Sequence, residues 1–282
     1  MGTDNYYSVK EDVQKYIDGC KTKMNVRTHK VFGRAVLAGM MIAFGASASN
    51  VAAHAVTNVG LSRLVAGCVF PVGLMMVVLL GAELFTGDCL MAMGNAEGAC
   101  TILDLIKFLF VVYVGNFVGS ILLVVVNVIS GQLNYSSGLL GAYTIKVAMG
   151  KVNMSFGQAL CSGILCNILV CAAVLMAMCA RDIVGKLFAC FFTIMLFVVA
   201  GYEHCIANMY YIPAGLIAAR NQNYVQIAMD TYGYTADQLA SLNLYGFFVK
   251  NLVPVTIGNI IGGAVLGLIL LYLHGYDKKK AA

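Results

Sequence analysis

The sequence predicts an all-α integral membrane protein with six transmembrane helices, and two observations carry this prediction. Hydrophobic residues make up 60% of the 282-residue chain and only 11% are charged, against about 25% in a soluble domain. The apolar residues gather in runs long enough to cross the hydrocarbon of a bilayer, which needs about 20 residues. This composition excludes a disordered chain, a nucleic-acid-binding protein and an ordinary cytosolic enzyme.

Six apolar segments are expected to span the membrane. They cover residues 31–55, 64–84, 105–129, 156–180, 186–219 and 246–273. The fifth segment is too long for one straight helix and contains Glu203, His204 and Asn208. The second segment runs directly into the polar residues Glu83 and Thr86. We therefore expect the second and fifth helices to be interrupted, because an unpaired charge is costly inside a membrane.

The polar ends of the chain flank this transmembrane domain of residues 31–273. Within residues 1–30, Ser8 and Glu11 have the spacing of a capping box and start an amphipathic helix. Its apolar face either lies on the cytoplasmic membrane surface or packs on the protein's own loops. Residues 220–245 are expected to form an external loop, and residues 274–282 a cytoplasmic tail.

The distribution of lysine and arginine predicts the orientation in the cytoplasmic membrane. Thirteen of these residues fall on the side that holds both termini and five on the other, so both termini should be cytoplasmic.

The ten cysteines contain no C-x-x-C spacing, and six lie in or beside apolar runs. We expect them to be free thiols, with no disulfide framework, metal site or cofactor.

The two halves of the chain, about 31–130 and 156–273, resemble each other. Three short matches occur in the same order, namely Phe32-Gly33 with Phe156-Gly157, Gly81-Ala82-Glu83 with Gly201-Tyr202-Glu203, and Gly115-Asn116 with Gly258-Asn259. Three spans are an odd number, so the second copy would enter the membrane from the opposite face as an inverted 3+3 repeat. Such repeats place a transport site near the midplane, where paired helices break.

Several polar side chains near these breaks are candidates for the site. Glu83 and Glu203 occupy equivalent positions and either serve transport or accept hydrogen bonds from backbone N–H groups freed by the breaks. His204 has no counterpart, since Leu84 takes the matching position, and its imidazole can donate one hydrogen bond and accept another.

Three further residues have two interpretations each. Thr86 and Asn167 either bond to helix carbonyls or join His204 in a polar waist. Lys151 is either an ordinary interfacial lysine or attracts anions to the external mouth.

These residues belong to motifs that resemble a known family. Glu83-Leu84-Phe85-Thr86-Gly87, Cys166-Asn167-Ile168-Leu169-Val170-Cys171, and Gly201-Tyr202-Glu203-His204 with Ala207-Asn208-Met209 are similar to signatures of the formate/nitrite transporter family. The resemblance implies an aquaporin-like six-helix protomer in the lipid bilayer, assembled as a homopentamer with one pore in each subunit. It implies a central selectivity site of Thr86 and His204, with Asn167, Glu203 and Asn208 nearby and Lys151 in a vestibule. It implies apolar constrictions at Phe70, Leu74, Leu84, Phe85 and Phe197.

We therefore expect a channel or transporter for small monovalent anions of weak acids, and formate is the expected substrate. Hydrosulfide is the alternative, followed by nitrite, acetate and lactate. A bare anion is penalised between apolar rings, so His204 would supply a hydrogen bond or a proton, giving either anion flow or anion–proton symport. A membrane enzyme using His204 with Glu203 or Cys205 is the remote alternative. It is disfavoured because neighbours on one helix do not form a nucleophile–base pair.

Overall fold

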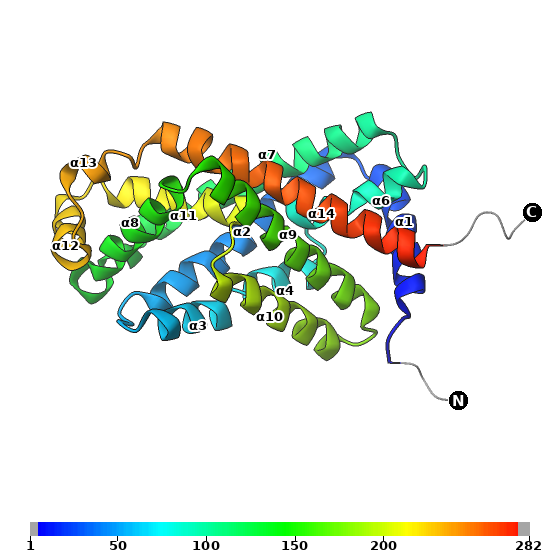
Figure 1. Cartoon of the computed structure of the whole chain (residues 1–282), viewed down its shortest axis with the longest axis horizontal. Helices are drawn as coiled ribbons and strands as arrows, with labels where there is room; N and C mark the ends of the chain where they lie inside the picture. Colours follow the sequence, from blue (N-terminus) through cyan, green and yellow to red (C-terminus); the bar gives the residue numbers. More distant parts are fainter. Residues whose placement is uncertain (1–4, 276–282) are drawn as a thin grey trace, which may run out of the picture.

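The computed structural model describes residues 5–275 as a bundle of helices (Figure 1). Within these residues, six helical segments are long and apolar enough to cross a membrane, which confirms the predicted number. They are α2 (Thr28–Ala53), α3 with α4 (Val59–Val69 and Val72–Leu79), α7 (Ile102–Ile129), α9 (Phe156–Cys179), α10 (Ile183–Ala200), and the π-helix η2 with α14 (Gly246–Leu252 and Val253–His274).

The second and fifth segments each stop short and restart. After α4 the chain runs through an extended stretch into α5 (Phe85–Asp88) and α6 (Met91–Ala96), and after α10 it enters α11 (Cys205–Ala218) in the same way. Gly81 and Gly201 end the first parts with φ of +64° and +77°, a left-handed conformation that glycine adopts without a steric penalty. Leu84 and His204 then cap the second parts with nearly the same backbone, φ/ψ of −113°/119° and −114°/113°.

Close helix pairs hold the bundle together. Helix α2 packs along α7, and α9 packs along α14. The backbones approach closely because glycines lie at the contacts: a Cβ at Gly119 would overlap the Val36 carbonyl, and one at Gly262 would overlap the Ile164 carbonyl. Small residues at such crossings are how membrane helices gain packing contacts without a hydrophobic driving force.

The N-terminal helix α1 (Val9–Met24) packs on the protein. The capping box of Ser8 and Glu11 is present, and the apolar face contacts α6, α9 and α14. Val13, Tyr16, Ile17 and Cys20 are buried on this face. Of the two placements that the sequence left open, the structure therefore has the one against the protein's own elements.

The far end of the bundle contains more helix than the sequence predicts. Residues 220–245, expected as a loop, contain α12 (Gln222–Tyr232) and α13 (Ala236–Leu239). Residues between the two similar halves of the sequence form a 3-10 helix η1 (Gln132–Gly138) and helix α8 (Leu139–Val152), which no prediction covered. Helices α8, α12 and α13 lie at the opposite end from α1 (Figure 1).

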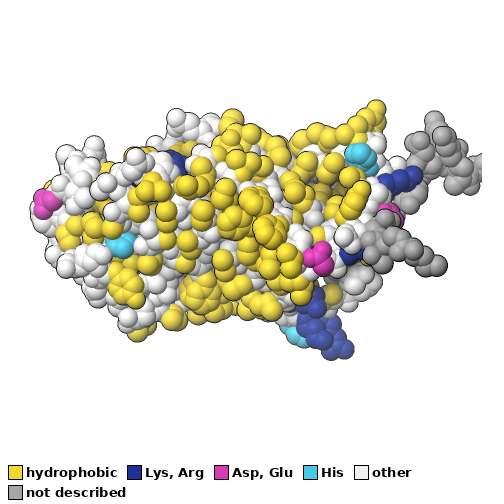
Figure 2. Space-filling model, turned by 90° about the horizontal axis from the view of Figure 1, so that it is seen from below, with side chains coloured by type: hydrophobic (Ala, Val, Ile, Leu, Met, Phe, Trp, Pro, Cys, Tyr) yellow, Lys and Arg dark blue, Asp and Glu magenta, His cyan; other side chains and the backbone are white. Residues whose placement is uncertain are grey.

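The surface agrees with a membrane protein. Figure 2 shows hydrophobic side chains across the middle of one face, and most of the lysine and arginine visible there lies at the end that holds α1. Of the predicted tail 274–282, residues 276–282 and their three lysines lie outside the described part of the chain.

Candidate functional site

Two cavities approach each other at the two helix breaks. The wide vestibule, of about 540 Å³, opens toward α8 and is lined among others by Asn50, Arg63, Phe70, Lys146, Lys151, Phe197, Glu203 and His204. The narrow vestibule, of about 200 Å³, opens toward α1 and is lined among others by Tyr16, Lys23, Leu74, Leu84, Asp88 and Val174. The wall between them is built from the residues that interrupt the helices.

Thr86 and His204 meet between the vestibules. The threonine Oγ1 lies 3.1 Å from the histidine Nε2, and the two residues are 0% and 2% exposed. His204 lines the wide vestibule, whereas Leu84, its repeat equivalent, lines the narrow one. The two helix breaks thus bring together two hydrogen-bonding groups that are 118 positions apart in the sequence.

The backbone determines which nitrogen of His204 carries the proton. Its Nδ1 accepts the Ala207 N–H at 3.0 Å and so caps α11. A neutral imidazole has one donor and one acceptor nitrogen, so the proton is on Nε2, which donates to Thr86. A second proton on Nδ1 would face the Ala207 N–H and break this cap.

Asparagine side chains form hydrogen bonds with backbone N–H and carbonyl groups at both helix breaks. Asn116 accepts the Phe85 N–H at 2.9 Å and donates to the Glu83 carbonyl at 3.0 Å. Asn259 does the same with the Cys205 N–H at 2.9 Å and the Glu203 carbonyl at 3.0 Å. The interpretation that the glutamate carboxylates accept these freed N–H groups is therefore wrong. Asn116 and Asn259 are matched positions in the two halves of the sequence, and this match was the one sequence feature that pointed to a shared role.

The two carboxylates pair with lysines instead. Glu83 lies 2.6 Å from Lys23 of α1, which also pairs with Asp88. Glu203 lies 2.8 Å from Lys151 of α8. Sequence reasoning missed the roles of Lys23 and Asp88 because the lysine reaches the site from a helix outside the repeat.

Asn167 and Asn208, two of the predicted site residues, form hydrogen bonds with other groups of the site rather than with His204. Asn167 donates to the carbonyls of Thr86 at 3.0 Å and Asn259 at 2.6 Å, which is the carbonyl-bonding interpretation. Asn208 donates to the Glu203 carboxylate at 2.7 Å, as does Asn251 at 3.1 Å. These amides therefore hold the walls around the Thr86–His204 pair.

Apolar side chains flank the Thr86–His204 pair on both sides. Phe70 and Phe197 pack edge-to-face at 5.5 Å on the wide side, and Phe197 stacks on the His204 ring at 5.9 Å. Leu74 and Leu84 border the narrow vestibule. Phe85, the fifth predicted constriction residue, packs its ring at 4.8 Å against Tyr113.

Charge distinguishes the vestibules. Three cations and one carboxylate line the wide vestibule, namely Arg63, Lys146, Lys151 and Glu203. Lys151 also lies 5.2 Å from the centre of the Tyr211 ring. The narrow vestibule is lined by one lysine and one aspartate. The wide vestibule therefore has the electrostatic field that attracts anions.

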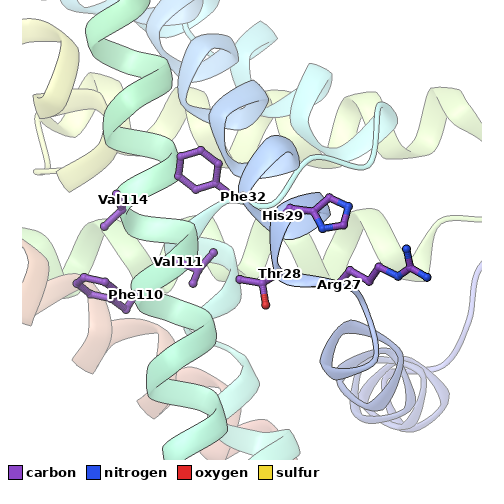
Figure 3. A pocket seen from close by; sticks show the side chains of 7 residues that line it. All are labelled: Arg27, Thr28, His29, Phe32, Phe110, Val111 and Val114. Atoms are coloured by element: carbon purple, nitrogen blue, oxygen red, sulfur yellow. The ribbon is translucent and has the colours of Figure 1, made fainter.

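A third cavity lies apart from this site. It is an open groove of about 790 Å³ on the outside of the bundle between α2 and α7. Figure 3 shows its lining residues, Arg27, Thr28, His29, Phe32, Phe110, Val111 and Val114. None of the predicted site residues borders it.

Comparison with known proteins now decides the family, because a model described as formate/nitrite transporter matches residues 10–273. The chain belongs to the formate/nitrite transporter family. It is similar to the formate channel FocA of Haemophilus influenzae, with 40% identity over 89% of each chain. It is also similar to a probable formate transporter of Methanothermobacter thermautotrophicus, with 37% identity over 89% of this chain and 90% of the relative.

A solved structure, described as a pentameric formate channel with formate bound, aligns with a TM-score of 0.80 and 34% identity. The alignment covers 87% of this chain and 96% of that one. These matches confirm the resemblance based on the motifs around Thr86, Asn167 and His204. As a member of the formate/nitrite transporter family, the chain is an integral membrane transport protein and not an enzyme.

Proposed function

We propose that this protein is a channel or transporter for formate, with Thr86 and His204 as the central selectivity site. The observation that carries the proposal is the buried Thr86–His204 pair between a cationic vestibule and a narrow vestibule whose lining lysine and aspartate offset each other. The descriptions of the relatives as formate channels support the choice of anion. In this proposal the wide vestibule is external and α1 covers the cytoplasmic side, as the lysine and arginine distribution predicts.

The pathway begins with attraction of the anion. Lys151, with Arg63 and Lys146, concentrates formate in the wide vestibule. Phe70 and Phe197 then oppose a bare charge, because an ion loses its hydration between apolar rings. A proton from vestibule water converts formate to formic acid, which has no net charge and crosses this constriction at lower cost.

His204 acts in this scheme as a neutral hydrogen-bond donor. Its Nδ1 is occupied by the Ala207 N–H, so the ring offers only the Nε2–H that now points to Thr86. An arriving carboxyl group replaces Thr86 as the acceptor, and the freed threonine hydroxyl can donate to it as well. Leu84 and Leu74 form the second apolar constriction on the way out. Net movement is therefore a symport of formate and a proton.

The scaffold of this proposal is an aquaporin-like inverted repeat with interrupted second and fifth helices, assembled as a homopentamer. The equivalent contacts of Asn116 and Asn259 support the repeat, since each asparagine joins one break to the middle of another helix. The neighbouring structure described as pentameric supports the assembly.

Flux of the purified protein in liposomes tests the proposal. We expect formate uptake with one proton, and slower uptake of acetate, nitrite, hydrosulfide and chloride. His204→Asn keeps a side chain that caps a helix and donates a hydrogen bond, so it should retain proton-coupled uptake, whereas His204→Leu should lose uptake. Absence of formate uptake by the unaltered protein would refute the substrate. Formate uptake without proton movement in His204→Asn would show that the histidine is the proton source.

A further inference from the structure

We propose that the wide vestibule contains a second anion site, ahead of the Thr86–His204 pair, in which the amide of Asn50 donates a hydrogen bond to a small carboxylate or similar oxyanion. The inference deepens the proposed function and rests on it for the choice of formate as the probe. The site would hold the anion before it meets the apolar rings.

Asn50 is a buried residue in the wall of the vestibule. It lies in the last turn of α2, is 6% exposed and lines the wide vestibule. Its Nδ2 has no hydrogen-bond partner among the described residues. A buried N–H group without an acceptor is costly, so an acceptor from the vestibule would stabilise this side chain.

Hydrogen bonds connect the wall beside Asn50 to the neighbourhood of Lys151. Ser49 donates its hydroxyl proton to the Ala46 carbonyl at 2.8 Å, so the 2.7 Å contact with Tyr211 is a hydrogen bond donated by the tyrosine. The ring of the same tyrosine lies 5.2 Å from the Lys151 ammonium. Tyr211 thus connects the neighbour of Asn50 to the principal cation of the vestibule.

The surrounding charge favours an anion over a neutral acceptor. Arg63, Lys146 and Lys151 line the cavity against the single carboxylate of Glu203. Lys151 already pairs with that carboxylate at 2.8 Å, and Lys146 lies 4.6 Å from the centre of the Tyr232 ring, so no further carboxylate among the described lining residues offsets the charges of Arg63 and Lys146. An unpaired amide donor inside a positive cavity is complementary to a carboxylate.

The repeat gives an independent argument. The register that aligns Gly39 with Gly163 aligns Asn50 with Val174, and Val174 lines the narrow vestibule. His204 and Leu84 differ in the same way, with a polar side chain at the wide vestibule and an apolar one at the narrow vestibule. Asn50 is therefore a polar residue at a position where the equivalent half of the scaffold has an aliphatic one.

Formate flux measured separately from each side of the membrane tests the site. Asn50→Leu removes the donor at nearly constant size and should raise the half-saturating formate concentration on the wide-vestibule side about tenfold. Such a change corresponds to about 1.4 kcal/mol. Asn50→Asp should raise it further, because it also adds a negative charge. Half-saturation from the narrow-vestibule side should not change. The control is Asn223→Leu, the same substitution at an exposed position of α12.

Broadening of the ¹³C-formate resonance by the purified protein reports binding without transport. We expect a formate site that Asn50→Leu removes and Thr86→Val retains. Unchanged half-saturation and unchanged broadening in both Asn50 variants would mean that the amide binds only water, which overturns the inference. An equal change from both sides would mean a structural effect of the substitution and would overturn it as well. Formate binding that requires Asn50, without uptake by the unaltered protein, would refute the proposed function alone.

Discussion

Replacing Asn116 or Asn259 with alanine should destabilise the protein more than replacing a half-buried asparagine away from the helix breaks. Each side chain makes three buried hydrogen bonds at a helix break. Asn116 binds the Phe85 N–H, the Glu83 carbonyl and the Ala35 carbonyl, at 2.9, 3.0 and 2.7 Å. Asn259 makes the equivalent set, with its third bond to the Gly163 carbonyl at 2.8 Å.

The magnitude follows from these contacts. A buried hydrogen bond contributes about 0.5–1.5 kcal/mol net in soluble proteins and about 0.6 kcal/mol between membrane helices, so three give about 2–4 kcal/mol. Water cannot replace them, because Asn116 and Asn259 are 0% exposed. Asn127 is the matched control, since its amide donates to Ser47 and Tyr210 at a half-buried position away from the breaks. Its loss should cost about 1 kcal/mol.

Reversible unfolding in mixed micelles, followed by circular dichroism, measures these differences. The two alanine variants should have similar free energies of unfolding, both below that of Asn127→Ala. Formate uptake should fall in both, because the capped ends carry Phe85 and Cys205 beside the central pair. Equal stability of all three variants would refute the argument that these amides hold the breaks.

Three further predictions concern α1 and helix packing. Lys23→Met should lower the hydrogen-exchange protection of α1 amides, because it removes both ion pairs that join α1 to the first break; unchanged protection would contradict this. Burial raises the pKa of the Asp12 carboxyl on α1 to about 6, so the docked helix binds this proton more tightly than the undocked one. Docking should therefore be weakest above pH 6 and strengthen as the pH falls from about 6 toward the ordinary carboxyl pKa of 3.8, and Asp12→Asn should keep α1 protected at pH 7.5. Gly119→Ala should impair folding, judged by the yield of stable detergent-solubilised protein, whereas Gly33→Ala should not, since a Cβ there meets no atom within 4 Å.

Hydropathy was enough to predict the number of spans and their approximate positions. Each predicted span overlaps an observed helix, because a run of about 20 apolar residues has few alternatives in a membrane. Helix α8 escaped prediction because its 14 residues are too few to span a bilayer, and it is buried by packing on α11 and α12 instead. The contacts of Lys23 were not predicted either, because a sequence does not show which distant carboxylate a flexible side chain reaches.

The site shows the same limit. Composition identified Glu83 and Glu203 as unusual, yet their partners depend on where α1 and α8 pack. Asn116 and Asn259 were visible as a repeated pair, but their function required knowing that each faces a break. Repeat matching finds equivalent positions, and only the packed structure shows what each position touches.

The matched positions in the two halves of the sequence differ in polarity but not in backbone shape. The backbone at Leu84 and His204 is nearly identical, so the two breaks differ in side-chain polarity rather than in shape. At both compared positions the polar member, His204 or Asn50, borders the wide vestibule, and the apolar member, Leu84 or Val174, borders the narrow one. At these two positions an anion would therefore meet a hydrogen-bond donor on the wide side and an aliphatic side chain on the narrow side. Because a passive pathway cannot change the equilibrium across a membrane, this asymmetry must act on affinity and rate from each side, and the direction of net flow must come from the gradients alone.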